Sequence, residues 1–283
     1  MTEEFQVRPL RQDEIDIPLD MAAEEGWNPG LEDGPAFFQA DPGGFLAGEI
    51  DGKLINVISA VRYGETFGFI GFYICKPEFR GRGYGHRLWD KAMAHLCART
   101  VGLDAVKEQT ASYAEHGFRS VYRNVRHAGL SVCDTPMDPR LAPLGQGLFP
   151  AVRDYDRDFF PAPRTEFIKL WTAPMLETRR GFAFVEDGSL KGYGVIRQCR
   201  DGYKIGPLFA DTPEIADTLY QALAGQVKGQ MVILDTPEPN AAALFLAETY
   251  ELSPEFETFR MYRGLAPELP LDQTFGITTF ELG

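Results

Sequence analysis

The sequence contains few of the residues from which metal sites and disulfide frameworks are built. It has four cysteines and four histidines among 283 residues. The cysteines lie far apart, and the histidines show no metal-ligand spacing with them. Zinc sites and disulfide-rich domains need closely spaced ligands or short closed loops. The sequence therefore predicts no bound metal and no disulfide framework.

Long apolar runs and an excess of basic residues are also missing. No uninterrupted apolar stretch approaches the roughly 20 residues that cross a bilayer. The first residues, MTEEFQVRPL, are acidic where a signal peptide is basic. The counts of 28 Lys and Arg and 41 Asp and Glu give a net charge of 28 − 41 = −13, whereas a nucleic-acid ligand needs a basic surface. We therefore expect a cytoplasmic protein that binds neither a membrane nor a nucleic acid.

The elements predicted in the first half recur in the same order in the second half. Residues 45–63 are typical of two strands that turn at Asp51-Gly52, and the aromatic run 67–75 indicates a buried strand. An amphipathic helix over 85–99 follows. After it we expect a strand at 101–106, a helix at 111–116 and a strand at 117–127, and in the second half strands at 181–186, 191–197, 203–209, 231–235 and 256–263 with helices at 213–226 and 239–249.

A proline-rich stretch separates the two sets of elements. Residues 131–165 contain six prolines and show no sustained periodicity. At about 150 residues per domain, the chain length fits two domains. We therefore place a boundary near residue 130, with domains at 1–130 and 131–283, and interpret the repeated order as a diverged internal duplication.

A glycine-rich loop, Arg80-Gly-Arg-Gly-Tyr-Gly85, joins the buried strand to the helix. Backbone N–H groups at a helix N-terminus bind anions. Between Lys76 and Lys91 there are five basic and two acidic residues, a local charge of 5 − 2 = +3. A pyrophosphate is the simplest ligand that explains both features, and the alternative is an ordinary glycine turn. The loop has neither the Gly-Lys-Ser/Thr of a P-loop nor the glycine spacing of a dinucleotide fingerprint.

The segment CKPEFRGRGYGHRL resembles the acetyl-coenzyme A signature of the GNAT superfamily of N-acetyltransferases. The signature is Arg or Gln, two residues, Gly, one residue, then Gly or Ala, and Arg80, Gly83 and Gly85 occupy these places. A second block, Tyr113-Ala-Glu-His-Gly-Phe118, is similar to the Tyr-x-x-x-Gly-Phe segment that closes the family's core. The resemblance covers residues 5–130. It implies an α/β fold, the mixed-sheet acyl-CoA N-acyltransferase (GNAT) fold, with acetyl-CoA as co-substrate.

The resemblance also implies which residues hold the co-substrate. The backbone of the strand before the loop would bind the pantetheine arm, and the loop amides would bind the pyrophosphate. These residues are Tyr73, Ile74, Cys75, Arg80, Gly81, Arg82, Gly83, Tyr84 and Gly85.

Two residues are candidates for proton transfer. The resemblance implies that Tyr113 protonates the departing thiolate, and an unperturbed tyrosine pKa near 10 suits that role. Tyr113 could instead be a packing aromatic. Glu65, which ends a strand beside the expected acetyl site, is a candidate general base acting through water. Val106 stands where many family members have an asparagine.

Other residues have a structural and a functional interpretation. Cys75 is either a small core residue or a nucleophile, and the lack of a neighbouring base favours the core. His116 is either a structural histidine or an aid to proton transfer. Trp27, Phe37 and Phe38 either line an acceptor pocket or anchor the helices before the first hairpin.

The second half resembles the degenerate GNAT-like repeat of certain two-domain bacterial members. Asp211-Thr-Pro-Glu214 stands where its glycine loop should be. Acidic residues repel a pyrophosphate and Pro213 lacks an N–H donor. We therefore expect no acetyl-CoA site of the usual kind in this half.

The resemblance implies an N-acetyltransferase that moves an acetyl group to a primary amine by direct attack in a ternary complex. The alternative is a non-catalytic acyl-CoA-binding or regulatory module. Eleven acidic residues and no Lys or Arg lie between Asp13 and Asp51. They either attract a cationic small-molecule amine or form a solvated surface. The sequence leaves open whether the protein is a monomer or a homodimer.

Overall fold

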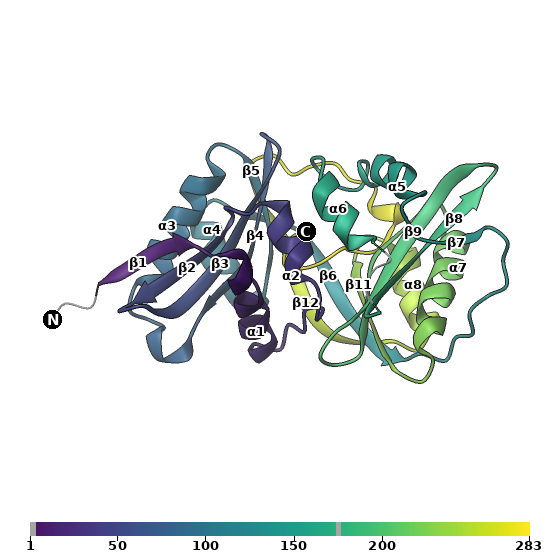
Figure 1. Ribbon diagram of the computed structural model, residues 1–283, viewed down its shortest axis with the longest axis horizontal. Coiled ribbons are helices and arrows are strands. Elements are labelled where there is room, and N and C mark those ends of the chain that lie inside the picture. The colour runs from purple at the N-terminus through teal and green to yellow at the C-terminus, as the bar shows by residue number, and fades with distance from the viewer. Residues whose placement is uncertain (1–3, 174–176) are drawn as a thin grey trace.

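The computed structural model describes residues 4–173 and 177–283, and its strands form one sheet that runs through the molecule (Figure 1). The strand order is β1-β2-β3-β4-β5-β12-β6-β11-β10-β9-β8-β7, and β13 pairs with β10. The strands are β1 Phe5–Pro9, β2 Phe45–Ile50, β3 Lys53–Tyr63, β4 Phe67–Cys75, β5 Thr100–Ala105, β6 Arg119–Leu130, β7 Leu141–Pro143, β8 Arg179–Glu186, β9 Ser189–Gln198, β10 Tyr203–Ala210, β11 Met231–Pro237, β12 Ser253–Arg263 and β13 Thr274–Gly276.

The helices lie on both sides of this sheet. In Figure 1, α3 and α4 accompany the first half, whereas α7 and α8 accompany the second. In the described residues, no helix is both long and apolar enough to span a bilayer. The α-helices are α1 Asp16–Glu24, α2 Gly34–Ala40, α3 Tyr84–Leu96, α4 Thr110–Glu115, α5 Phe149–Asp156, α6 Thr165–Trp171, α7 Pro213–Ala224 and α8 Ala241–Thr249.

The same tight turn joins two long antiparallel strands in each half. Asp51 and Gly52, between β2 and β3, have φ angles of +50° and +76°. Asp187 and Gly188, between β8 and β9, have φ angles of +50° and +74°. Two consecutive positive φ angles match the twist of a two-residue hairpin and favour Asp-Gly. The hairpin predicted from Asp51-Gly52 is confirmed, and the same turn in the second half supports an internal duplication.

The two sequence halves exchange strands at the centre of the sheet. β12 comes from the second half, yet it pairs antiparallel with both β5 and β6 of the first. β6 in turn pairs antiparallel with β11 of the second half. The halves on either side of residue 130 therefore share one continuous sheet. β12 lies next to β5, so residues of the second half come close to the carboxyl ends of β4 and β5.

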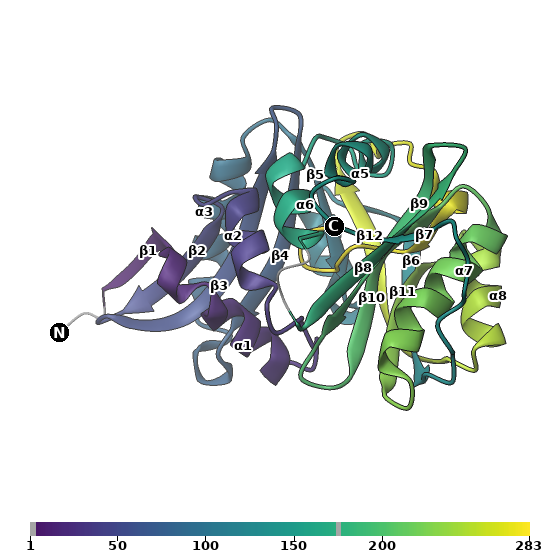
Figure 2. The ribbon, with the colours of Figure 1, turned by 45° about the vertical axis from the view of Figure 1, so that its right-hand side comes forward.

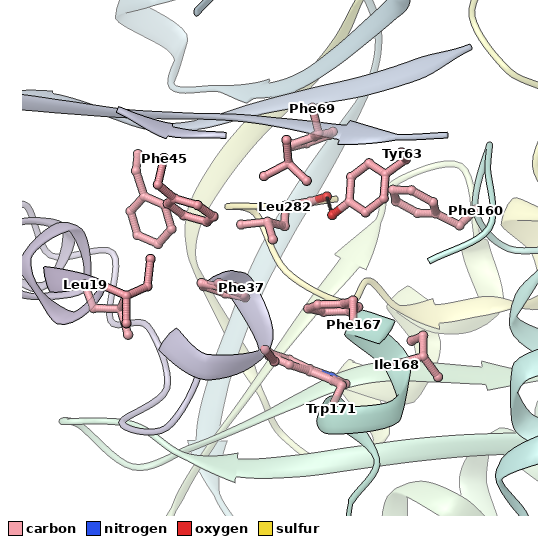
Figure 3. Close-up of a cluster of buried hydrophobic side chains, with 14 of the residues drawn as sticks. Leu19, Phe37, Phe45, Tyr63, Phe69, Phe160, Phe167, Ile168, Trp171 and Leu282 are labelled. Atoms are coloured by element: carbon pink, nitrogen blue, oxygen red, sulfur yellow. Dashed lines mark hydrogen bonds between the residues drawn. The ribbon is translucent and has the colours of Figure 1, made fainter. Parts of the chain in front are cut away.

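An aromatic core fills the space between the halves (Figure 3). Phe37 of α2 stacks on Trp171 of α6 with ring centroids 5.7 Å apart. Phe160, from the proline-rich stretch, packs edge-on against Tyr63 of β3 at 4.6 Å. Phe37 is thus a core residue, and the partly buried Phe38 packs against the same cluster. The sequence predicts no regular elements in 131–165, yet the structure forms β7 and α5 there, because β7 pairs with β8 and α5 packs on β9.

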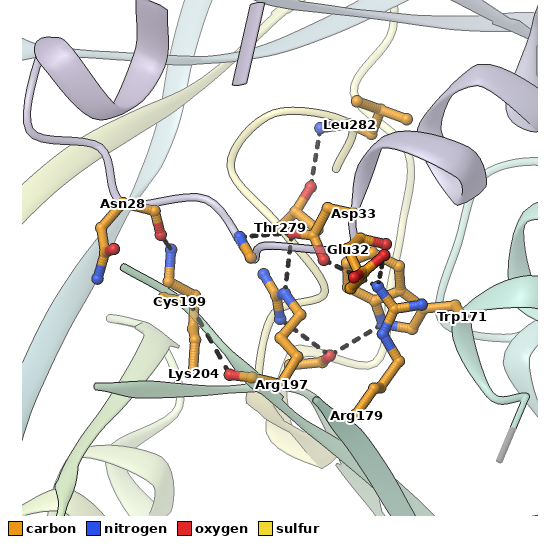
Figure 4. A network of polar contacts seen from close by, with 12 residues as sticks. Asn28, Glu32, Asp33, Trp171, Arg179, Arg197, Cys199, Lys204, Thr279 and Leu282 are labelled. Carbon is orange, nitrogen blue, oxygen red and sulfur yellow. Dashed lines mark hydrogen bonds and ion pairs between the residues drawn. The ribbon is translucent and has the colours of Figure 1, made fainter. Parts of the chain in front are cut away.

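A buried ionic network ties the segment before α2 to the second half (Figure 4). Asp33 accepts hydrogen bonds from Arg197 Nε and Arg179 Nη2, each at 3.0 Å. Burial alone would raise the pKa of Asp33, but the two guanidinium groups hold it below its usual value. Lys204 Nζ donates to the Asn28 carbonyl at 2.9 Å. The network therefore fixes the position of the neighbouring Trp27.

Candidate active site

A cleft opens where β4 and β5 diverge. These parallel strands pair from Phe67 to Ile70 of β4. Beyond that point β4 bulges, with a φ of +48° at Phe72 and a register shift against β3. The edge of β4 after Ile70 therefore lies along a cleft of about 930 Å³. Backbone groups on such an edge are free to bind an extended ligand.

The glycine-rich loop forms one end of the cleft. Gly81 and Gly83 have φ angles of +75° and +82°, and Gly83 is the N-cap residue of α3. Only glycine adopts such angles without strain. Among the described residues no atom lies within 4 Å of where a Cβ would stand on either glycine. The first N–H groups of a helix have no intrahelical acceptor, so this loop can hold an anion.

The structure brings the predicted co-substrate residues together. Except for Arg82, whose guanidinium lies 5.7 Å from the Phe79 ring centroid, they all line the cleft. Arg80 Nε donates to the Cys75 carbonyl at 2.7 Å, and its guanidinium pairs with Glu25. Cys75 is half-buried, and burial raises the pKa of its thiol. A thiol kept protonated is a poor nucleophile.

Tyr113 of α4 lies in the same cleft. Its ring packs against Trp89 at 5.6 Å and Phe118 at 6.1 Å. Burial, with a contribution from Tyr73, raises the pKa of Tyr113 above its ordinary value. Burial also raises the pKa of Tyr73 to about 12. Both phenols therefore stay protonated at neutral pH and can donate a proton.

A smaller inner pocket of about 50 Å³ adjoins the cleft. Trp27, Tyr73, Val106, Tyr113 and Phe256 line both spaces. Trp27 thus belongs to a pocket wall, while Phe37 and Phe38 do not. The sequence analysis missed Phe256 of β12, because only the strand exchange brings it here and no motif marks it.

Two other candidates lie away from the cleft. Glu65 is exposed in the turn before β4, whereas the cleft borders the opposite end of that strand. The structure therefore does not bring Glu65 to Tyr113. His116 packs against Trp89 at 5.2 Å, and its Nδ1 lies 2.9 Å from the Ser112 carbonyl. These contacts describe a structural histidine.

The acidic residues between Asp13 and Asp51 do not gather at the cleft. Asp33 is buried among arginines, Asp41 pairs with Arg62 at 2.9 Å, and Glu25 alone of this set is a cleft residue. Within residues 4–173 and 177–283, no group of three His, Cys, Asp or Glu side chains is arranged to hold a metal ion.

The corresponding place in the second half is filled by the chain itself. β10 and β11 pair in parallel from Tyr203 to Ile205 of β10. Beyond that point β13 pairs antiparallel with β10, and the Ile277 amide donates to the Asp235 carbonyl at 2.9 Å. Thr212 Oγ1 caps α7 by accepting from the Ile215 amide at 3.4 Å. The strand edge and the helix N-terminus are both occupied by protein groups.

We therefore expect one acetyl-CoA molecule per chain. Calorimetric titration should give a stoichiometry of one, because β13 and Thr212 occupy the second half's counterpart of the cleft. A stoichiometry of two would contradict this assignment of the second half.

Comparison with known proteins identifies the family to which this fold and cleft belong. The model of the Acetyltransferase (GNAT) family matches residues 11–123, and an Acetyltransferase (GNAT) domain model matches residues 152–276. A protein of Pseudoalteromonas sp. (strain SANK 73390) named holothin acyltransferase is 31% identical over 98% of this chain and 94% of its own. The chain belongs to the GNAT family, has two GNAT domains and is an acyltransferase.

Further relatives agree on the fold. The uncharacterized N-acetyltransferase YitH of Bacillus subtilis is 23% identical over 82% of each chain. A crystal structure from Pyrococcus horikoshii has a TM-score of 0.81 at 21% identity, covering 99% of this chain and 96% of that one. A tandem GNAT protein from the clavulanic acid biosynthesis pathway has a TM-score of 0.63 at 15% identity, covering 93% and 100%.

Proposed function

We propose that the cleft of the first half transfers an acetyl group from acetyl-CoA to a primary amine by direct attack in a ternary complex. The observation that carries the proposal is the convergence of three features on one cleft. They are the open edge of β4, the glycine loop at the N-terminus of α3, and the partly buried phenol of Tyr113.

Each feature has one task in this reaction. The backbone of Tyr73, Ile74 and Cys75 binds the pantetheine arm as an added strand. The amides of the loop hold the pyrophosphate at the positive end of the α3 dipole. Tyr113 gives its proton to the thiolate as the carbon–sulfur bond breaks. Holding both substrates together supplies the orientation on which direct attack depends.

A cationic acceptor suits the charge of the outer cleft. Its lining contains two basic residues, Arg80 and Lys107, and four glutamates, which are Glu25, Glu108, Glu255 and Glu257. A cleft with an excess of one charge sign concentrates ligands of the opposite sign. Glu108 and Glu255 give the main support, because the other two carboxylates pair with arginines. The acidic segment between Asp13 and Asp51 adds little for the same reason.

An amine panel tests the proposal. We expect CoA thiol release from acetyl-CoA only when an amine is present, with spermidine and lysine used better than glutamate, and with kcat/KM falling as salt rises. Acetyl-CoA binding without amine-dependent thiol release would identify a non-catalytic module. Preference for glutamate, or kinetics independent of salt, would contradict the cationic acceptor.

A further inference from the structure

The yellow end of the chain, marked C in Figure 1, lies between the two halves in both ribbon views (Figure 2). Tyr63 Oη of β3 donates to the Leu282 carbonyl at 3.1 Å, and the Leu282 amide donates to Thr279 Oγ1 at 2.9 Å. Gly71 of β4 permits this approach, because a Cβ there would stand 1.9 Å from the Glu281 carbonyl oxygen. The second half thus places Glu281 beside the β4 edge that borders the cleft.

The Glu281 side chain is buried without a hydrogen-bond partner. The residue is 2% exposed and lines the inner pocket. Neither carboxylate oxygen accepts a hydrogen bond from any other part of the chain that the structure describes. Burying a carboxylate costs free energy unless donors pair with it. Glu281 is therefore set to accept hydrogen bonds from a bound molecule.

Two arginines near Glu281 are engaged with other carboxylates, and the nearby Lys204 donates to the Asn28 carbonyl. Arg126 and Arg197 lie within electrostatic range of Glu281. Arg126 Nε pairs with Asp235 at 2.7 Å, and Arg197 Nε pairs with Asp33 at 3.0 Å. Both guanidinium groups therefore point their hydrogen bonds at other carboxylates, and the Glu281 oxygens remain available for a ligand.

The other walls of the inner pocket suit a small amine. Trp27, Tyr113 and Phe256 give it aromatic sides that continue into the cleft. Thr258 Oγ1, also a lining group, is buried and has no hydrogen-bond partner among the described residues. A narrow apolar pocket with a few polar groups fixes the orientation of what it binds.

We propose that the inner pocket receives the acceptor's amino group and that Glu281 accepts a proton from its nitrogen. This inference rests on the proposed amine acetylation. The nitrogen forms a bond to the thioester carbonyl carbon, and the bond from that carbon to sulfur breaks. The acceptor enters this step as the neutral amine, after its ammonium group has lost one proton to water. Glu281 then takes one proton from the nitrogen, and Tyr113 supplies one to the sulfur. Glu281 afterwards gives its proton to water and the Tyr113 phenolate takes one from water, so the step needs no further reactant. The small volume of the pocket favours primary amines on slender, unbranched stems.

Substitution of Glu281 tests this role, with spermidine, lysine and butylamine as acceptor probes. Glu281→Gln should lower kcat/KM for the amine by about 10²–10⁴-fold, the range of general base catalysis, while acetyl-CoA affinity stays unchanged. Glu281→Ala should regain part of its rate when formate is added. Glu268→Gln, which alters an exposed carboxylate of the same half, is the matched control and should behave as wild type.

Three outcomes would overturn the inference. One is wild-type kcat/KM in a folded Glu281→Gln enzyme. Another is a lowered melting temperature in every Glu281 variant, including Glu281→Asp, with no rescue by formate, because that result identifies a structural carboxylate. A wild-type enzyme that binds acetyl-CoA but acetylates none of the three probes overturns the proposed acetylation, and the role of Glu281 falls with it.

Discussion

Replacing Tyr113 by phenylalanine is expected to lower kcat by roughly 10²–10⁴-fold, the usual contribution of general acid catalysis. The phenol lines both the cleft and the inner pocket, and burial raises its pKa so that it keeps its proton at neutral pH. Acetyl-CoA affinity should change little, because phenylalanine preserves the ring contacts with Trp89 and Phe118. Steady-state kinetics and calorimetry measure the two quantities separately.

Two further variants serve as controls for the Tyr113→Phe experiment. Tyr220→Phe removes a buried phenol oxygen from α7 of the second half, and it should leave kcat unchanged. Tyr73→Phe alters a second cleft phenol that also lines the inner pocket. Its oxygen lies against α3, 2.8 Å from where a Cβ on Gly85 would stand. A fully active Tyr113→Phe enzyme would leave Tyr113 as a packing residue. A large loss confined to Tyr73→Phe would make Tyr73 the acid.

Replacing Gly83 by glutamate is expected to abolish acetyl-CoA binding. Gly83 is the N-cap of α3, and its φ of +82° strains any residue with a Cβ. The added carboxylate would stand at the helix N-terminus and repel the pyrophosphate that the loop is proposed to hold. Calorimetry should show no binding in a protein that still unfolds cooperatively.

Gly52→Glu is the matched control for backbone strain. Gly52 has a φ of +76°, and, as at Gly83, no described atom lies within 4 Å of where its Cβ would stand. It lies in the turn between β2 and β3, outside the cleft-lining set. The two variants should lose similar stability, about 1–2 kcal/mol for a left-handed residue, but only Gly83→Glu should lose binding. Unchanged affinity in folded Gly83→Glu would refute the proposed pyrophosphate site.

The local elements could be predicted because their signals are local. Asp51-Gly52 and Asp187-Gly188 specify tight turns by their φ angles alone. The amphipathic pattern predicts α3 from 85 to 99, and the helix ends at Leu96 because Cys97 leaves it with a φ of +52°. The glycine loop follows from the same kind of information, since closely spaced glycines between a strand and a helix indicate positive φ angles, which Gly81 and Gly83 adopt. Such features depend on residues close together in the sequence.

The remaining site residues depend on contacts between distant segments. Glu65 precedes β4 and the glycine loop follows it, but the sheet is needed to show that the cleft lies along the far end of β4 and not beside Glu65. Trp27 could have been a core residue like Phe37, and the Asp33 network decides otherwise by fixing its segment against the second half. No local pattern contains this information.

From the sequence alone, the resemblance to the GNAT family indicated the fold class. Local patterns indicated the main strands and helices of both halves and the glycine loop, because backbone conformation and periodicity are encoded locally. Only the tertiary structure decided that β12 lies between β5 and β6, that β13 fills the second cleft and that Glu281 borders the inner pocket. The physical reason is that strand pairing and burial are settled by the best packing of the whole chain. The sequence does not distinguish an exposed glutamate from one that is buried without a hydrogen-bond partner.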